Sequence, residues 1–110
     1  MKLPNADRCV IERQKLLTYL LNASHPENGG KAAFFATLGF HEGSWETFAQ
    51  ALRQLALSAN ATECVQSAHG QKFIVDGELI GPTGRTAAVR TVWIVDLGED
   101  APRLVTAYPD

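Results

Sequence analysis

Residues 71–108, QKFIVDGELIGPTGRTAAVRTVWIVDLGEDAPRLVTAY, decide the fold of this chain. The segment contains three runs rich in β-branched and aromatic residues, separated by turn-forming residues. The sequence GPTG at 81–84 predicts a tight turn with proline at its natural second position. The runs therefore predict strands over 71–80, 85–96 and 102–108, and such short connections join antiparallel neighbours.

The flanking sequence completes the architecture. Residues 63–67 predict one more strand, whereas the first half of the chain is helical in pattern. Apolar residues at helical spacing predict helices over 12–21, 31–38 and 45–56. Helices followed by a meander predict one α+β domain over 1–110, with three N-terminal helices packed on one face of a four-stranded antiparallel sheet.

The turns also predict which sheet face is buried. Centring the first turn on Pro82 and Thr83 pairs Phe73 with Val92 and, two residues on, Val75 with Arg90. One face then holds a core of Phe73, Val75, Leu79, Val92, Ile94 and Leu104, with Arg90, Thr106 and Tyr108 at one margin. A register slip of one residue would exchange the two faces.

The other predicted face carries apolar residues among charged ones. They are Ile74, Trp93, Val95 and Val105. An exposed indole beside three aliphatic side chains is typical of an interface. We therefore expect a homodimer or another protein partner on this face.

Composition excludes several classes of protein. Ten basic and twelve acidic residues among 110 give a net charge of −2, which argues against strong non-specific binding of nucleic acid. No apolar run approaches the roughly 20 residues of a membrane helix. The first residues, MKLPNAD, lack an apolar signal segment, so we expect a cytoplasmic protein. Cys9 and Cys64 stand far apart and predict free thiols that are buried or half-buried, and no motif predicts a metal or a cofactor.

Several polar groups are nevertheless suited to an anion. Gly29-Gly30-Lys31 opens a helix with backbone N–H groups and a cation, and His25 precedes it as a candidate acid or base. Arg90 at the core margin requires a carboxylate, carbonyl groups or a bound anion. The candidate catalytic residues are His25, Lys31, Arg90 and Tyr108, and the candidate anion-binding residues are Gly30, Lys31, Arg85, Arg90 and Thr106. A surface histidine, a solvated lysine, a structural cation and a packed tyrosine are the alternative interpretation.

Some segments also carry a resemblance to a known family. They include KLPNA at 2–6, HP at 25–26, GPTGR at 81–85, VWI at 92–94 and PRLVTAYP at 102–109. With them the chain resembles, over nearly its whole length, a family of short bacterial proteins catalogued as a domain of unknown function and seen also as a module of polymorphic toxins. At the level of fold it is similar to the barnase–EndoU–colicin–RelE ribonuclease toxins. The resemblance implies an RNase-like toxin domain or an inactive relative.

Three functions remain open at this point. The first is a binding or interaction module, toxin-related, that uses the Trp93 face. The second is a metal-independent endoribonuclease that cleaves RNA by attack of the 2′-hydroxyl, with cations around the phosphate. The third is a binder of a small anion or nucleotide at Gly30 and Lys31. The enzyme gains support if His25, Lys31, Arg90 and Tyr108 meet in space, and the binding module if Trp93 faces outward.

Overall fold

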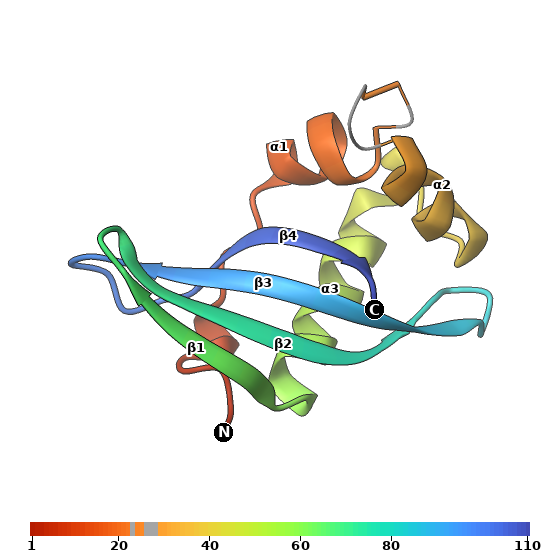
Figure 1. Cartoon of the computed structure of the whole chain (residues 1–110). Coiled ribbons are helices and arrows are strands. Elements are labelled where there is room, and N and C mark those ends of the chain that lie inside the picture. Colours follow the sequence, from red (N-terminus) through yellow and green to blue (C-terminus); the bar gives the residue numbers. More distant parts are fainter. Residues whose placement is uncertain (23, 26–28) are drawn as a thin grey trace.

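The computed structural model describes residues 1–22, 24–25 and 29–110 and has helices followed by one antiparallel sheet (Figure 1). The sheet has the strand order β1-β2-β3-β4, with β1 Ala61–Ser67, β2 Gly70–Ile80, β3 Thr86–Asp96 and β4 Arg103–Pro109. The helices are α1 Arg13–Lys15, α2 Gly29–Thr37 and α3 Trp45–Ser58, with a π-helical turn η2 Leu16–Leu20 and 3-10 turns η1 Ala6–Arg8 and η3 Glu42–Ser44. The predicted α+β class and four-stranded meander are confirmed.

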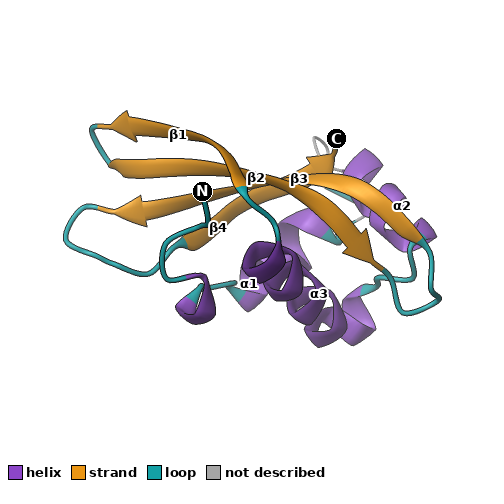
Figure 2. Ribbon diagram, turned by 90° about the horizontal axis from the view of Figure 1, so that it is seen from below, coloured by secondary structure: helices purple, strands orange, loops and turns teal. Residues whose placement is uncertain are grey.

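The helices lie on one side of the sheet, although not as one even layer (Figure 2). α3 packs against β2 and buries a stripe of five residues, Phe48, Ala49, Leu52, Leu55 and Ala56. α1, η2 and α2 gather beside the edge formed by β4 (Figure 1). The opposite face, which we call the open face, is covered by none of the described helices. Within the described residues, no helix is long and apolar enough to cross a membrane.

The predicted pairing of β2 with β3 is wrong by one residue. Phe73 lies opposite Trp93, not opposite Val92. The reason is the connecting loop, which closes with a hydrogen bond from the Gly81 amide to the Arg85 carbonyl at 2.8 Å. It holds one residue more than a two-residue turn, with Gly84 at a φ of +88°. An odd change in loop length turns every side chain of the following strand to the other face.

The corrected register exchanges the faces of β3. Val89, Thr91 and Trp93 point into the core and are each 0% exposed. The predicted core residues Phe73, Val75, Leu79 and Leu104 are buried as expected. By the alternation along β3, Val92 and Ile94 lie on the open face. Val92 is buried as predicted, at 8% exposure, and Ile94 is half-buried, but neither belongs to the core cluster under the helices, so their placement on the helix-covered face was wrong. The predicted placement of Trp93 on an exposed interface was wrong for the same reason, because Trp93 belongs to the core. Val95 also packs against the core.

A bulge in β4 completes the sheet. Arg90 lies opposite Tyr108 and Val92 opposite Thr106. Beyond them the register shifts, so that Trp93 lies opposite Leu104 and Val105 is the extra residue of β4. The extra residue allows both Leu104 and Ala107, three positions apart, to be buried.

A chain of two buried hydrogen bonds ties β3 to β2. The indole Nε1 of Trp93 donates to Thr91 Oγ1 at 2.8 Å, and Thr91 Oγ1 donates to the Val75 carbonyl at 2.8 Å. Among the described residues, Thr91 is the polar side chain that is buried, at 0% exposure. Each group in this chain has a partner, which removes the penalty for burying a polar atom.

We expect Thr91→Val to destabilise the protein by about 1–3 kcal/mol, because the indole N–H of Trp93 would stay buried without its acceptor. Trp93→Phe in the Thr91→Val background removes that donor as well. The two changes together should therefore cost less than the sum of the single changes, measured by urea unfolding as a double-mutant cycle. Strictly additive costs would contradict the coupling.

Candidate functional site

The Lys31 ammonium group joins three elements at the β4 edge. Lys31, in the first turn of α2, donates to the Tyr19 hydroxyl oxygen at 3.0 Å and to Thr106 Oγ1 at 3.2 Å. Its Nζ also lies 5.4 Å from the ring centroid of Tyr108. η2, α2 and β4 therefore meet at one amine. With His25, these residues form what we call the Lys31 cluster: Tyr19, His25, Lys31, Thr106 and Tyr108.

Tyr19 lies between the other members of the cluster. Its hydroxyl oxygen is 3.4 Å from Thr106 Oγ1, and its ring meets the His25 ring edge-on at 5.4 Å between centroids. Lys15 Nζ lies 5.9 Å from the same ring. The hydrogen bond from Lys31, followed by the one with Thr106, lowers the pKa of the Tyr19 hydroxyl below its usual value.

Arg90 stands beside the cluster on β3. Its Nε and Nη2 donate to the two carboxylate oxygens of Asp76 at 2.8 and 2.9 Å, and Asp110 lies 3.9 Å from Nη2. Asp76 raises the pKa of Arg90, and a hydrogen bond with Tyr108 acts in the same direction. The Arg90 hydrogen bond lowers the pKa of Asp76 in return. The carboxylate that a guanidinium here was expected to need is therefore Asp76.

The structure brings most of the candidate site residues together. His25, Lys31, Thr106 and Tyr108 belong to the cluster, and Arg90 lies opposite Tyr108 across the strands. Gly30 is exposed at the start of α2. Arg85 donates instead to the Thr37 carbonyl at 3.2 Å, at the far end of α2. In the described chain, the contacts of Arg85 do not join it to the cluster.

Tyr19 is the member that sequence reasoning missed. In the sequence it is one residue of the predicted helix 12–21, next to Leu20. The available signal was a polar-tipped aromatic residue three positions after Leu16, on an otherwise apolar stripe. Tyrosine in such a place is half-buried and needs a partner for its hydroxyl group.

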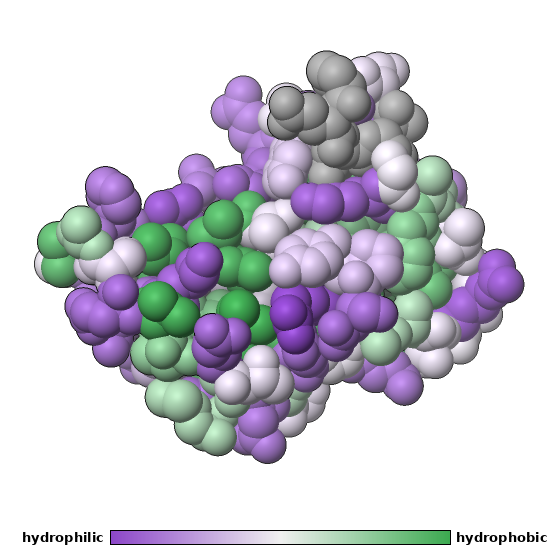
Figure 3. All heavy atoms as spheres, viewed as in Figure 1, coloured by the Kyte–Doolittle hydropathy of each residue, from purple (hydrophilic) through white to green (hydrophobic). Residues whose placement is uncertain are grey.

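The open face carries an apolar patch next to the Arg90–Asp76 pair. Strand pairing places Ile74, Val92 and Ile94 there, with Val65 of β1 at 40% exposure. In Figure 3, which shows this face, hydrophobic surface lies to one side of a hydrophilic region. Of the four predicted interface residues, Ile74 lies on this face. Trp93 and Val95 pack against the core instead, and Val105 is the bulged residue of β4.

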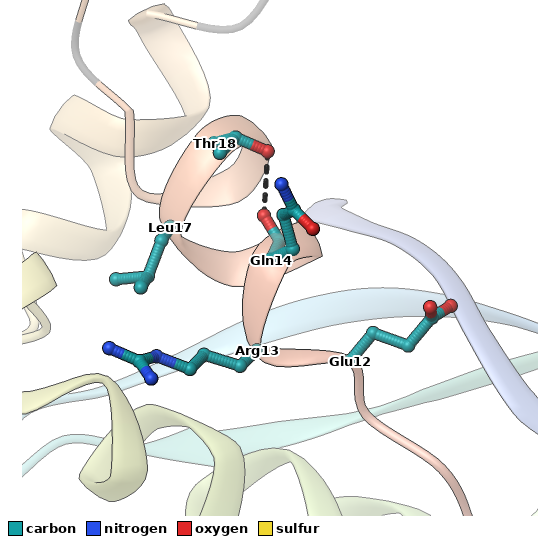
Figure 4. Close-up of a pocket in the computed structure, with 5 residues that line it drawn as sticks. All are labelled: Glu12, Arg13, Gln14, Leu17 and Thr18. Carbon is teal, nitrogen blue, oxygen red and sulfur yellow. Dashed lines mark hydrogen bonds between the residues drawn. The ribbon is translucent and has the colours of Figure 1, made fainter.

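A separate hollow of about 510 Å³ lies beside α1 (Figure 4). It is lined by Glu12, Arg13, Gln14, Leu17 and Thr18. Figure 4 shows Arg13 and Leu17 pointing to the same side while Glu12 points away. The Arg13 guanidinium lies 5.4 Å from the Trp45 ring, so the cation is already held by an aromatic face. No member of the Lys31 cluster lines the hollow.

Cysteines and metal ligands add nothing to the site in the part of the chain that the structure describes. Both cysteines are free thiols, as predicted. Cys9 is buried as expected, whereas the expected burial of Cys64 was wrong, because Cys64 is exposed. Burial raises the pKa of the Cys9 thiol. Among residues 1–22, 24–25 and 29–110, no three His, Cys, Asp or Glu side chains form a group that could hold a metal ion.

The fold and the cluster together define the class of protein. It is an α+β domain in which helices precede a four-stranded meander, with the Lys31 cluster at one sheet edge. The chain belongs to the family described as Domain of unknown function (DUF6883), whose profile matches residues 2–110. This confirms the family resemblance noted from the sequence. A comparison with curated proteins gives no significant match.

A solved structure shares the fold. One chain of the contact-dependent growth inhibition toxin–immunity protein complex from Klebsiella pneumoniae 342 is similar with a TM-score of 0.74. The match covers 92% of this chain and 99% of that chain at 18% sequence identity. At this identity the likeness shows a common fold.

The Asp76–Arg90 pair should make stability depend on pH in the acid range. Because the pKa of Asp76 is lowered in the folded protein, its carboxylate stabilises the fold above the ordinary carboxyl pKa, and that contribution is lost as the pH falls through the folded value. Asp76→Asn should therefore lower the melting temperature at pH 7, and the difference from wild type should vanish towards about pH 2.

Asp100→Asn is the matched control, because its partner Arg8 is largely exposed and such pairs contribute little. Melting curves across this pH range would measure both variants. A deficit of Asp76→Asn that stays constant with pH would contradict the role of the ion pair.

Proposed function

We propose that the Lys31 cluster is the active site of a metal-independent endoribonuclease of the toxin type. The observation that carries this proposal is the Lys31 ammonium group, which Tyr19, Thr106 and Tyr108 hold at the sheet edge, with His25 against Tyr19. Cleavage of RNA without a metal needs a cation at the phosphate and groups that move protons. In the cluster, Tyr19 contacts both the Lys31 cation and the His25 ring.

The reaction uses the 2′-hydroxyl of RNA as the nucleophile. Its oxygen attacks the adjacent phosphorus, the bond from phosphorus to the 5′-oxygen breaks, and the products are a 2′,3′-cyclic phosphate and a 5′-hydroxyl. Lys31 and Arg90 stabilise the charge of the phosphorane, Thr106 and Tyr108 position the phosphate, and His25 moves one of the two protons. Asp76 keeps the Arg90 guanidinium oriented.

The fold likeness supports the toxin setting of this proposal. The similar chain comes from a complex of a toxin and its immunity protein, so a protein partner of the present chain is part of the proposal. The net charge of −2 also fits an enzyme whose basic groups are local, since strong non-specific binding to nucleic acid would require a wide basic surface.

Purified protein should cleave total RNA in the presence of EDTA and leave 2′,3′-cyclic phosphate ends. We expect Lys31→Ala to lower the rate by about 10²-fold or more, since it removes the cation nearest the proposed phosphate. Lys72→Ala is the matched control, because Lys72 is an exposed open-face lysine outside the cluster, and it should cleave at the wild-type rate.

Intact RNA after incubation with folded wild-type protein would overturn the enzymatic proposal. A rise in the melting temperature of that protein with phosphate or mononucleotides, lost in Lys31→Ala, would then favour a small-anion or nucleotide binder at the same place.

A second candidate function is a binding module that uses the apolar patch of the open face. The observation in its favour is the set of aliphatic residues Val65, Ile74, Val92 and Ile94 on the face that the described helices leave uncovered. Apolar surface of this kind, bordered by charged side chains, is typical of interaction sites. A second copy of the chain is the simplest partner for it.

This second candidate expects the wild type to sediment as a dimer at high concentration. Ile94→Glu should then give a folded monomer, because Ile94 lies on the open face. Trp93→Glu should instead unfold the protein, because Trp93 is 0% exposed. A wild type that sediments as a monomer at every concentration would exclude the homodimer.

A further inference from the structure

The position of Tyr19 in the cluster points to a chemical role. It lies on η2, where the Leu21 amide donates to the Leu16 carbonyl at 2.8 Å, five residues back. Such π-helical turns are rare and occur frequently at functional sites. The turn sets the Tyr19 hydroxyl oxygen 3.0 Å from Lys31 Nζ and 3.4 Å from Thr106 Oγ1.

The two tyrosines of the chain meet the same amine in different ways. Lys31 Nζ lies near both rings, 5.1 Å from the centroid of Tyr19 and 5.4 Å from that of Tyr108. In addition, it donates a hydrogen bond to the hydroxyl oxygen of Tyr19 at 3.0 Å. A hydrogen bond from an ammonium group stabilises a phenolate directly, because the negative charge develops on the accepting oxygen. Lys15 adds a second positive charge 5.9 Å from the Tyr19 ring. Tyr19 is therefore the hydroxyl of this cluster that the surrounding charges favour in its ionised form.

We propose that Tyr19 is the general base of the site, acting as a phenolate that Lys31 and Thr106 hold in place. This inference rests on the proposed ribonuclease function and assigns the proton that His25 does not move. The Tyr19 phenolate takes the proton of the 2′-hydroxyl while the 2′-oxygen bonds to phosphorus. Protonated His25 gives its proton to the departing 5′-oxygen. Tyr19 ends protonated and His25 neutral, and exchange with water restores both.

The first measurement needs no RNA. The chain has two tyrosines, so ultraviolet difference spectroscopy can follow each phenolate as the pH rises. We expect one tyrosine to ionise below about pH 10, the ordinary value for tyrosine. That phase should disappear in Tyr19→Phe, persist in Tyr108→Phe and move to higher pH in Lys31→Met. Absence of the early phase from the wild type would overturn the assignment of Tyr19.

The second measurement uses cleavage. Tyr19→Phe should lower the rate by about 10²-fold or more while its melting temperature stays close to that of the wild type. The reacting form has Tyr19 as a phenolate and His25 protonated, so the wild-type rate should follow a bell-shaped pH profile. In Thr106→Val, which removes one hydrogen bond to the phenolate, the limb of that profile set by Tyr19 should move to higher pH. A Tyr19→Phe variant that cleaves at the wild-type rate with the wild-type pH profile would overturn the inference.

The two measurements separate this inference from the proposed function. Folded wild-type protein that shows the early tyrosine phase and leaves RNA intact would refute the ribonuclease, and with it the role of Tyr19 as a base. Protein that cleaves RNA without the early phase would keep the ribonuclease and refute the role of Tyr19.

Discussion

The chain of hydrogen bonds from Trp93 through Thr91 to the Val75 carbonyl is the constraint on which the rest of the structure depends. A buried indole needs an acceptor, and Thr91, two residues earlier on the same face of β3, supplies it. The threonine hydroxyl in turn donates a hydrogen bond to the Val75 carbonyl of the neighbouring strand. A slip of one residue would turn this chain to solvent and bring the Arg90 guanidinium into the core, where an unpaired charge is far costlier than an exposed aliphatic group.

The same constraint positions the candidate site. With Trp93 inward, Arg90 faces outward opposite Tyr108, and the pairing of Val92 with Thr106 places that hydroxyl on the same side. The helices complete the site. η2 and α2 lie beside the β4 edge, so Tyr19 and Lys31 contact Thr106 on β4. Packing of the core and assembly of the polar cluster are thus two results of one register.

Arg90 and Lys31, the two main cations of the site, have different surroundings. Arg90 is bound by both oxygens of Asp76, with Asp110 nearby, so carboxylates already balance its charge. The contacts given for Lys31 in the described chain are the hydroxyl oxygens of Tyr19 and Thr106 and the faces of two aromatic rings. In the proposed reaction both cations face the phosphate. Asp76 orients the Arg90 guanidinium, and Lys31 also supports the Tyr19 oxygen.

The sequence by itself determined the α+β class, the order of helices and strands, and the polar residue types that meet at the β4 edge, because periodicity and turn residues are local properties. It did not determine which face of β3 is buried, since Val92 and Ile94 on one side and Val89 and Trp93 on the other are equally apolar. That choice followed from one residue of loop length and from the acceptor for the indole. The part played by Tyr19 was likewise decided only in the folded chain, because its partners Lys31 and Thr106 lie 12 and 87 residues away along the sequence.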